Sequence, residues 1–206
     1  MNYQRLKTKV EEYYSQKLSK YGAKPQGVDW KDRRTQDLRF TILLELIKDA
    51  KKFSLNDLGC GYGALWKYLQ IRHHRCQYIG YDISPVMIKA ATSIFPWSKN
   101  CKFVCSDQLQ LADYTVSSGL FNVKLDVPSD TWLDYILYNL KLMDRASRKG
   151  FAFNLLTSFS DPSRRRKDLY YADPGFFFKY CKTRFAKKVA LLHGYDLYEF
   201  TILVKK

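Results

Sequence analysis

At 206 residues, the chain is long enough for one domain with a sizeable hydrophobic core and too short for two ordinary domains. A hydrophobic content of 46% and an aromatic content of 16% exclude a disordered chain. The formal net charge of +15 favours anionic partners, namely a nucleic acid, an acidic small molecule or a membrane surface, beside the alternative of a solvated basic surface.

The first fifty residues are predicted to be helical. Residues 3–20 carry polar and apolar positions at helical spacing, and a Gly/Pro-rich break separates them from a second helix that begins near Thr35. Because both helices precede the first predicted strand, we expect residues 1–52 to fold over a ligand as a lid. The side chains that could then reach the ligand are Tyr13, Tyr14, Trp30, Gln36 and Arg39.

Neither a membrane span nor a secretory signal is predicted. No apolar run approaches the ~20 residues of a membrane-spanning helix, and residues 1–5 lack the apolar core of a signal peptide. The five cysteines form no C-x-x-C pair, which favours reduced thiols over a disulfide framework or a zinc site. We therefore expect a soluble cytoplasmic protein.

The most informative stretch of the chain is residues 53–63. A short apolar run ends in Asp57, and three alternating glycines, Gly59, Gly61 and Gly63, precede a helical pattern. Glycine permits the positive φ of a sharp turn and lets a ligand approach the bare backbone. The helix after the turn offers unpaired N–H groups at its start. The stretch thus predicts a strand, a ligand-binding turn and a helix N-terminus.

A second acid, Asp82, closes the next predicted strand, residues 77–81, about where a ribose-binding carboxylate is expected. Together with Ala64, the glycines also satisfy the dinucleotide fingerprint G-x-G-x-x-G/A, so a nicotinamide enzyme is an alternative. However, Asp57 can face an ammonium group rather than a pyrophosphate. The order of Asp57, the three glycines and Asp82 closely resembles motifs I and II of class I S-adenosylmethionine-dependent methyltransferases.

The resemblance implies a Rossmann-like α/β fold, a three-layer sandwich whose seven-stranded, mostly parallel sheet closes with an antiparallel hairpin. Alternating strand-like and helical segments, with two β-like runs at 188–193 and 197–204 after them, agree with that order. We accordingly expect a single methyltransferase domain over residues 1–206, with a helical lid at 1–52 and the Rossmann-like core at 53–206.

The resemblance also implies S-adenosylmethionine as the methyl donor and S-adenosylhomocysteine as the product. In this family an acid or amide after the third strand meets the adenine amino group, which assigns Asp107, with Gln108 as the alternative. Arg39 is the candidate cation for the methionine carboxylate, unless it faces solvent. The predicted cofactor-binding residues are Asp57, Gly59, Cys60, Gly61, Gly63, Asp82, Ile83, Met87, Asp107, Gln108, Ser118 and Arg39.

Local signals place two further helices. Ser84, with a proline after it at the first helical position, predicts a helix start. Ser129 or Asp130 is expected to cap an amphipathic helix over residues 131–145. Trp132 lies on the apolar stripe of that helix, where core packing and substrate stacking are the alternatives.

The predicted fourth strand, residues 113–119, is informative because certain motifs are missing after it. The sequence contains neither the Asn/Asp-Pro-Pro-aromatic segment of enzymes that methylate base amino groups nor a Pro-Cys for attack on a pyrimidine ring. No carboxylate stands at the end of this strand to begin a magnesium site. We therefore predict metal-independent transfer, with no residue assigned as a metal ligand.

The candidate catalytic base is His193, which ends a strand directed at the active-site edge and has an unperturbed pKa near neutrality. The alternative is a hydrogen-bonded hairpin histidine. Tyr170 and Tyr171 join it as candidate catalytic residues, and Glu199 could pair with a lysine instead of contacting substrate. Residues 158–174 combine a basic run with tyrosines, which either hold an anionic substrate or form a solvated loop. The candidate substrate-binding residues are Trp30, Asn154, Arg164, Arg165 and Tyr195.

The predicted function is methyl transfer to an oxygen or nitrogen of a small acceptor, anionic or glycan-like. Residues 27–30, 118–122 and 198–201 resemble a bacterial subgroup of small class I methyltransferases associated with polysaccharide or other specialised biosynthesis. The first alternative is an RNA methyltransferase, which the charge favours although no RNA-binding module is appended. The others are a non-catalytic cofactor-binding interaction protein and the nicotinamide oxidoreductase. The sequence predicts no oligomeric state.

Overall fold

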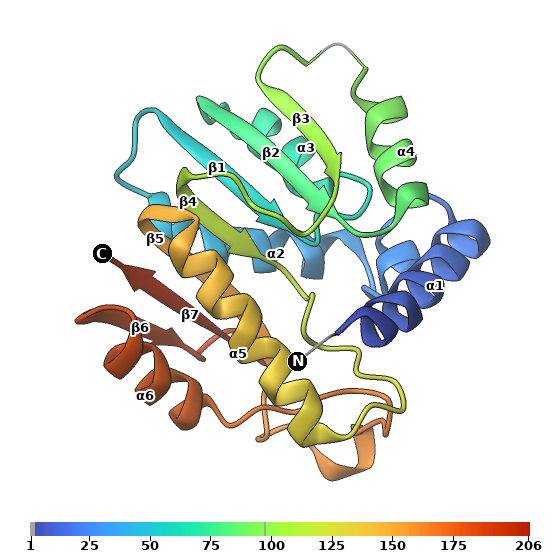
Figure 1. The fold of residues 1–206 in the computed structure, drawn as a ribbon, viewed down its shortest axis with the longest axis vertical. Helices are drawn as coiled ribbons and strands as arrows, with labels where there is room; N and C mark the ends of the chain where they lie inside the picture. Colours follow the sequence, from blue (N-terminus) through green and yellow to red (C-terminus); the bar gives the residue numbers. More distant parts are fainter. Residues whose placement is uncertain (1–2, 97) are drawn as a thin grey trace.

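The computed structural model describes residues 3–96 and 98–206. Met1 and Asn2, which belong to the segment used for the signal-peptide prediction, lie outside the described residues. The chain forms a seven-stranded sheet in the order β3-β2-β1-β4-β5-β7-β6 (Figure 1). The strands are β1 (Phe53–Leu58), β2 (Cys76–Asp82), β3 (Cys101–Cys105), β4 (Ala112–Ser117), β5 (Ser147–Leu156), β6 (Lys188–Leu192) and β7 (Glu199–Lys205).

Helices surround this sheet on both faces, as expected for the predicted α/β class. The α-helices are α1 (Gln4–Tyr21), α2 (Arg33–Leu44), α3 (Ala64–Ile71), α4 (Pro85–Ile94), α5 (Ser129–Arg145) and α6 (Pro174–Arg184). Three short 3-10 helices are η1 (Pro25–Val28), η2 (Glu45–Ile47) and η3 (Pro162–Arg164). Within the described residues, no helix combines the length and the apolar character needed to cross a bilayer.

Strand direction decides where a ligand can bind. The neighbouring strands from β3 through β5 run parallel to one another, whereas β7 runs antiparallel to both β5 and β6. This confirms the predicted Rossmann-like sheet with its C-terminal antiparallel hairpin. The carboxyl ends of the parallel strands therefore share one edge, which is where open α/β sheets bind ligands.

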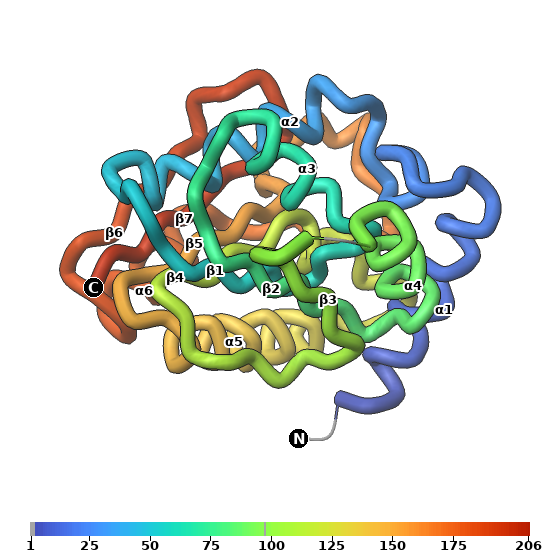
Figure 2. Tube along the Cα trace, turned by 90° about the horizontal axis from the view of Figure 1, so that it is seen from above, coloured from blue at the N-terminus to red at the C-terminus, as the bar shows by residue number. Residues whose placement is uncertain are grey.

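Two hydrophobic clusters separate the layers of the fold. On one face, α2, α3 and η2 pack on the sheet through buried side chains such as Leu43, Leu65 and Tyr78. On the other, α5 and α6 bury Trp132 and Phe177 against β5 and β7. The view along the sheet shows α5 on the opposite side from α2 and α3 (Figure 2).

Side-chain caps begin α2, α4 and α6, whereas α1, α3 and α5 show none among the described residues. As predicted, the Ser84 hydroxyl accepts a hydrogen bond from the Met87 N–H at the start of α4, and Pro85 is the first helical residue. The predicted cap of α5 was wrong. Ser129 is already helical, its preceding residue is Pro128, and no side chain caps the helix. Proline before the first turn fixes an extended approach, so the helix begins without a polar cap.

Candidate functional site

A cavity lies at the carboxyl ends of β1, β2 and β4, where the sheet meets α5 and the N-terminal helices. Its walls combine the glycine turn after β1 with residues from α1, α2 and the segment between them. The sequence-predicted residues that line this cavity are Tyr14, Trp30, Gln36, Asp57, Gly59, Cys60, Gly61, Asp82, Ile83, Met87, Asp107 and Ser118. Residues that are far apart in the chain thus meet in one place.

The turn between β1 and α3 exposes its backbone to the cavity. Gly61 has φ = 53°, a left-handed conformation that side chains other than glycine rarely adopt. A Cβ atom built there would lie 3.2 Å from Cγ1 of Val28. The Gly61 N–H donates to Oδ2 of Asp82 over 2.9 Å, which joins the turn to the end of β2. Gly63 is the N-terminal cap of α3 and lies outside the cavity lining.

Two carboxylates meet the cavity in different environments. Asp57 is only 2% exposed and accepts a hydrogen bond from the Tyr78 hydroxyl at 2.6 Å. Burial raises the pKa of Asp57 to about 7, against the lowering effect of Tyr78. Asp82 is half-buried and also accepts the Ser84 N–H at 2.9 Å. Burial raises its pKa too, although the backbone donors oppose the shift.

The raised pKa of Asp57 predicts how stability depends on pH. The folded chain keeps a proton on Asp57 up to about pH 7, whereas the unfolded chain releases it near the ordinary value of 3.8. The stability that this proton contributes is therefore lost as pH rises through the folded pKa. Urea unfolding at about pH 5 and about pH 8 should show a fall in free energy that the variant Asp57→Asn lacks.

Comparison with Asp57→Asn separates the effect of Asp57 on stability from the opposite effect of carboxylates whose pKa values are lowered. Asp113 and Asp168 have lowered pKa values, so their contributions are lost as pH falls through the folded pKa and are already present above the unfolded value of 3.8. Asp82 acts in the same direction as Asp57 and is present in both proteins. A wild-type protein whose pH dependence matches that of Asp57→Asn would contradict the prediction.

Helix α1 closes one side of the cavity. Val10, Glu11 and Tyr14 line it, and Lys7 forms an ion pair with Asp107 beyond β3. The Ser15 hydroxyl lies 2.9 Å from that of Ser84, at the start of α4. The N-terminal segment that we expected to cover a ligand therefore contacts the ends of β2 and β3. Gln108, the alternative to Asp107, is exposed and lies outside the lining.

Glu11 was missed by the sequence analysis. It lines the cavity, accepts a hydrogen bond from Ser15 at 2.7 Å, and its charge contributes to the raised pKa of Asp82. Two carboxylates thus face the same part of the cavity. No local motif marks Glu11, because an acid on an amphipathic helix is most often a solvated residue.

One polar atom in the cavity wall lacks a partner. The Ser118 hydroxyl is buried and finds no hydrogen-bond partner among the residues that the structure describes, although buried polar groups are almost always paired. It lies just past β4, at the opposite side of the glycine turn from β2. Among the described residues, no group of three or more His, Cys, Asp or Glu side chains could hold a metal ion.

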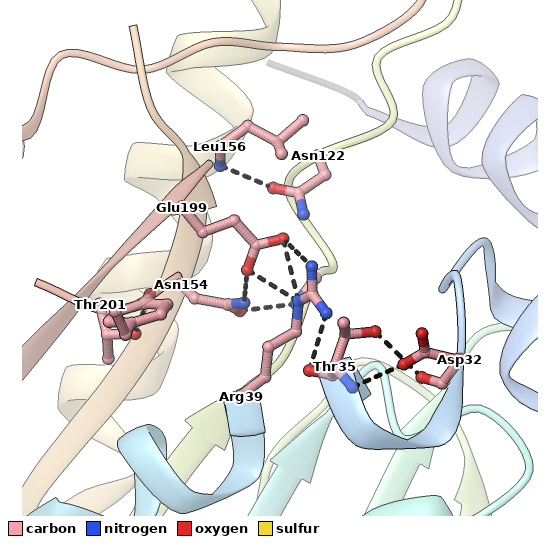
Figure 3. A network of polar contacts seen from close by, with 10 residues as sticks. Asp32, Thr35, Arg39, Asn122, Asn154, Leu156, Glu199 and Thr201 are labelled. Atoms are coloured by element: carbon pink, nitrogen blue, oxygen red, sulfur yellow. Dashed lines mark hydrogen bonds and ion pairs between the residues drawn. The ribbon is translucent and has the colours of Figure 1, made fainter. Parts of the chain in front are cut away.

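Arg39 does not line the cavity. Its Nε and Nη2 atoms donate to Glu199 over 2.7–3.0 Å, and Nη1 donates to the carbonyl of Thr35 at 2.8 Å (Figure 3). The suggested lysine partner of Glu199 was therefore wrong. Arg39 comes from the N-terminal segment and Glu199 from the last strand, so sequence spacing carried no signal of the pair. The carboxylate that binds Arg39 in this structure is the side chain of Glu199, whereas the sequence suggested the methionine carboxylate of the cofactor.

The candidate base lies away from the cavity. His193 comes directly after β6, one of the two edge strands, and its exposed ring packs beside Phe159 and Phe200 with centroid distances of 5.9 and 6.1 Å. Tyr195, in the same turn, bonds the Thr201 hydroxyl at 2.9 Å. The expected direction of β6 is correct, yet three strands lie between it and β1. The catalytic role of His193 stays a prediction that its position does not support.

The arginines of the basic loop, residues 158–174, bond to groups within the same loop. Arg165 donates to the carbonyls of Ser158 and Ser160, and Arg164 is exposed 3.7 Å from Asp161. The remaining candidates are also held by protein groups. Tyr170 donates its N–H to the carbonyl of Asn122, the Tyr171 hydroxyl accepts the Arg166 N–H, and Asn154 bonds Gly119 and Glu199. None of these sequence-predicted residues lines the cavity.

Comparison with known proteins gives a consistent result. A family model described as "Methyltransferase domain" matches residues 56–130. The chain is 50% identical over 164 residues to "Putative methyltransferase Rv1506c" of Mycobacterium tuberculosis strain H37Rv, covering 79% of this chain and 99% of that protein.

Two solved structures share the fold over nearly their whole length. One is magnesium protoporphyrin IX methyltransferase (ChlM) from Synechocystis PCC 6803 with bound S-adenosylmethionine, with a TM-score of 0.67 and 13% identity over 97% of this chain and 96% of that chain. The other is the N-methyltransferase NodS from Bradyrhizobium japonicum WM9 with S-adenosyl-L-homocysteine, with a TM-score of 0.66 and 17% identity over 96% and 98%.

Proposed function

This chain belongs to the class I S-adenosylmethionine-dependent methyltransferases, and on that premise we propose that it methylates an oxygen or nitrogen atom of a small-molecule acceptor. One observation carries the proposal. The cavity at the carboxyl ends of β1, β2 and β4 brings together a bare glycine turn, the carboxylates of Glu11, Asp57, Asp82 and Asp107, and the Ser118 hydroxyl, for which the described residues offer no hydrogen-bond partner.

The cavity residues fit the donor chemically. Bound S-adenosylmethionine supplies an electrophilic methyl group on a sulfonium. Asp82 and Glu11 offer carboxylate oxygens to the ribose hydroxyls, and a vicinal diol can donate one O–H to each. Asp57 accepts from the ammonium of the methionine moiety, which favours its ionised form and offsets the burial that raises its pKa. The Ser118 hydroxyl, which has no partner within residues 3–96 and 98–206, can bond the same moiety.

The adenine end of the donor is assigned to the side of the cavity near β2 and β3. Ile83 and Met87 provide apolar contacts there, and Asp107 provides an acceptor for the exocyclic amine. Lys7 pairs with Asp107 and neutralises its charge. The chain's main contributions to transfer are orientation and exclusion of water, which are worth up to about 7–11 kcal/mol in favourable cases.

A small acceptor is supported by the N-terminal residues at the cavity. Side chains of α1, η1 and α2 form part of its wall, together with the ends of the strands. The cations of the 164–166 segment are engaged by their own loop, through backbone carbonyls, Asp161 and Asp168. One structural neighbour, ChlM, is named for a small-molecule acceptor, magnesium protoporphyrin IX. A nucleic acid substrate, favoured by the net charge alone, is the competing outcome of an assay on cell extract.

We expect purified protein to bind S-adenosylhomocysteine in calorimetry and to transfer labelled methyl from S-adenosylmethionine to the small-molecule fraction of a cell extract. Treating the extract with RNase should leave the label in that fraction unchanged. Adding EDTA tests the predicted metal independence in the same assay. The variant Gly61→Arg provides the background, because its side chain would enter the cavity.

Two outcomes would contradict the proposal in different ways. Absence of heat with S-adenosylhomocysteine, together with absence of transfer, would exclude cofactor use by this chain. Label that appears in RNA and disappears after RNase treatment would replace the small-molecule acceptor by RNA. In that case binding should weaken steeply as salt concentration rises.

A further inference from the structure

Glu199 is the centre of a buried polar network beside the cavity. Its carboxylate is completely buried and receives N–H groups from Arg39 and from Asn154, the latter at 2.6 Å (Figure 3). Arg39 is 8% exposed and Asn154 is 1% exposed. The network joins α2, β5 and β7, which are far apart in the sequence.

A buried ion pair of this kind is weak evidence for stability. Desolvation of both charges consumes much of their attraction, and apolar side chains of similar size often stabilise a fold equally well. Removal of one partner alone is costly because it leaves an unpaired buried charge. The pair is therefore better explained by the groups that it holds in place than by its own contribution to folding.

The network holds two parts of the cavity wall. Asn154 accepts the Gly119 N–H through Oδ1 at 2.8 Å, which fixes the backbone next to the unpaired Ser118 hydroxyl. On the other side, the Arg39 guanidinium lies 3.8 Å from the ring centroid of Trp30, a cation–π distance. Both Trp30 and Gly119 line the cavity, whereas the three network residues do not.

Gly119 and Trp30 are also fitted to each other. Gly119 has φ = 75°, and a Cβ atom at this position would lie 2.2 Å from Cζ2 of Trp30. Only glycine leaves room for the indole at this distance. The indole is thus placed by the guanidinium of Arg39 and by the bare backbone of Gly119, both of which depend on Glu199.

We propose that Arg39, Asn154 and Glu199 are positioning residues that hold Trp30 and Gly119 as the cavity wall at the β4 end. The inference rests on the proposed function, because the wall is assigned to the cofactor. Arg39 acts through Trp30, in place of the direct contact with the cofactor expected from the sequence. Cofactor affinity then depends on the network separately from global stability.

The test compares Glu199→Gln with the double variant Arg39→Met/Glu199→Gln. The single variant leaves the guanidinium without its carboxylate, so the urea midpoint should fall. The double variant removes both charges, so the midpoint should return toward the wild-type value. Its dissociation constant for S-adenosylhomocysteine, measured by calorimetry, should nevertheless stay at least about tenfold higher than that of the wild type, because Trp30 has lost its cation.

A matched control and a second variant keep the test decisive. Phe151→Leu alters the buried core on the strand that carries Asn154, so it should lower the midpoint without changing affinity. Trp30→Leu should weaken binding as much as the double variant, and adding it to that variant should cause no further loss. The Trp30→Leu variant leaves the Arg39–Glu199 pair intact, so it tests the inference even where the double variant fails to fold.

Two results would overturn the inference. One is affinity within about twofold of wild type in the folded double variant, and the other is the same result in Trp30→Leu. Either would leave the network with a structural role only. Failure of the proposed function gives a different result, since the unaltered protein would then show no binding of S-adenosylhomocysteine.

Discussion

Gly61→Arg should raise the dissociation constant for S-adenosylhomocysteine by at least roughly 100-fold, which corresponds to about 2.7 kcal/mol. The residue has φ = 53°, and a Cβ atom there would contact Val28 at 3.2 Å across the cavity. An arginine side chain must therefore occupy the space assigned to the cofactor. It would also disturb the bond from the Gly61 N–H to Asp82, the proposed ribose contact. Titration calorimetry measures the effect directly.

Gly194→Arg is the matched control for this change. Gly194 lies in the exposed turn between β6 and β7, and a Cβ atom there meets nothing within 4 Å. The same added volume and charge should leave the dissociation constant unchanged at that position. Equal affinity in both glycine variants would show that the turn after β1 does not contact the cofactor, and the proposed site would have to be abandoned.

Trp132→Ala should lower the free energy of unfolding by about 3–5 kcal/mol, the cost of emptying a large buried site. Trp132 is completely buried between α5 and the sheet. Its indole N–H donates to the carbonyl of Phe121 at 2.8 Å. This position resolves the two alternatives raised by the sequence, since the ring belongs to the core and is absent from the cavity lining. Urea unfolding gives the value.

Trp132→Phe separates the contribution of the buried ring volume from that of the indole hydrogen bond to Phe121. Phenylalanine fills much of the volume and leaves only the Phe121 carbonyl without its donor, so the fall in stability should be smaller. Folded Trp132→Ala protein should retain wild-type affinity for S-adenosylhomocysteine. A loss of less than about 1 kcal/mol would contradict the core assignment, and loss of binding at full stability would restore the stacking alternative.

The features predicted correctly from the sequence are those that depend on residues close together in the chain. The Ser84 cap of α4 depends on residues within one turn, and the glycine turn with Asp57 lies within the single stretch 53–63. Asp82 required only a second strand at the expected spacing. Such local signals act before tertiary packing and are therefore visible without it.

Contacts across the sheet are what the sequence does not reveal. His193 was correctly expected at the carboxyl end of its strand, but chain order does not reveal that β7 lies between β5 and β6 and pushes β6 to the edge. Arg39 was expected either to bind the cofactor carboxylate or to face solvent, yet it pairs with Glu199, which is 160 positions away. Glu11 looks like a surface acid until α1 is packed over the end of β2. Each of these requires tertiary structure that periodicity does not encode.

The pairing of Arg39 with the final strand has a consequence for biosynthesis. During translation, Glu199 is made 160 residues after Arg39, so the guanidinium emerges long before its counter-charge. The glycine turn, Asp57 and Asp82 are made early as well. A chain that ends before β7 therefore carries these motifs but lacks Glu199, so the ion pair that holds Arg39 beside Trp30 can form only once the last strand pairs with β5.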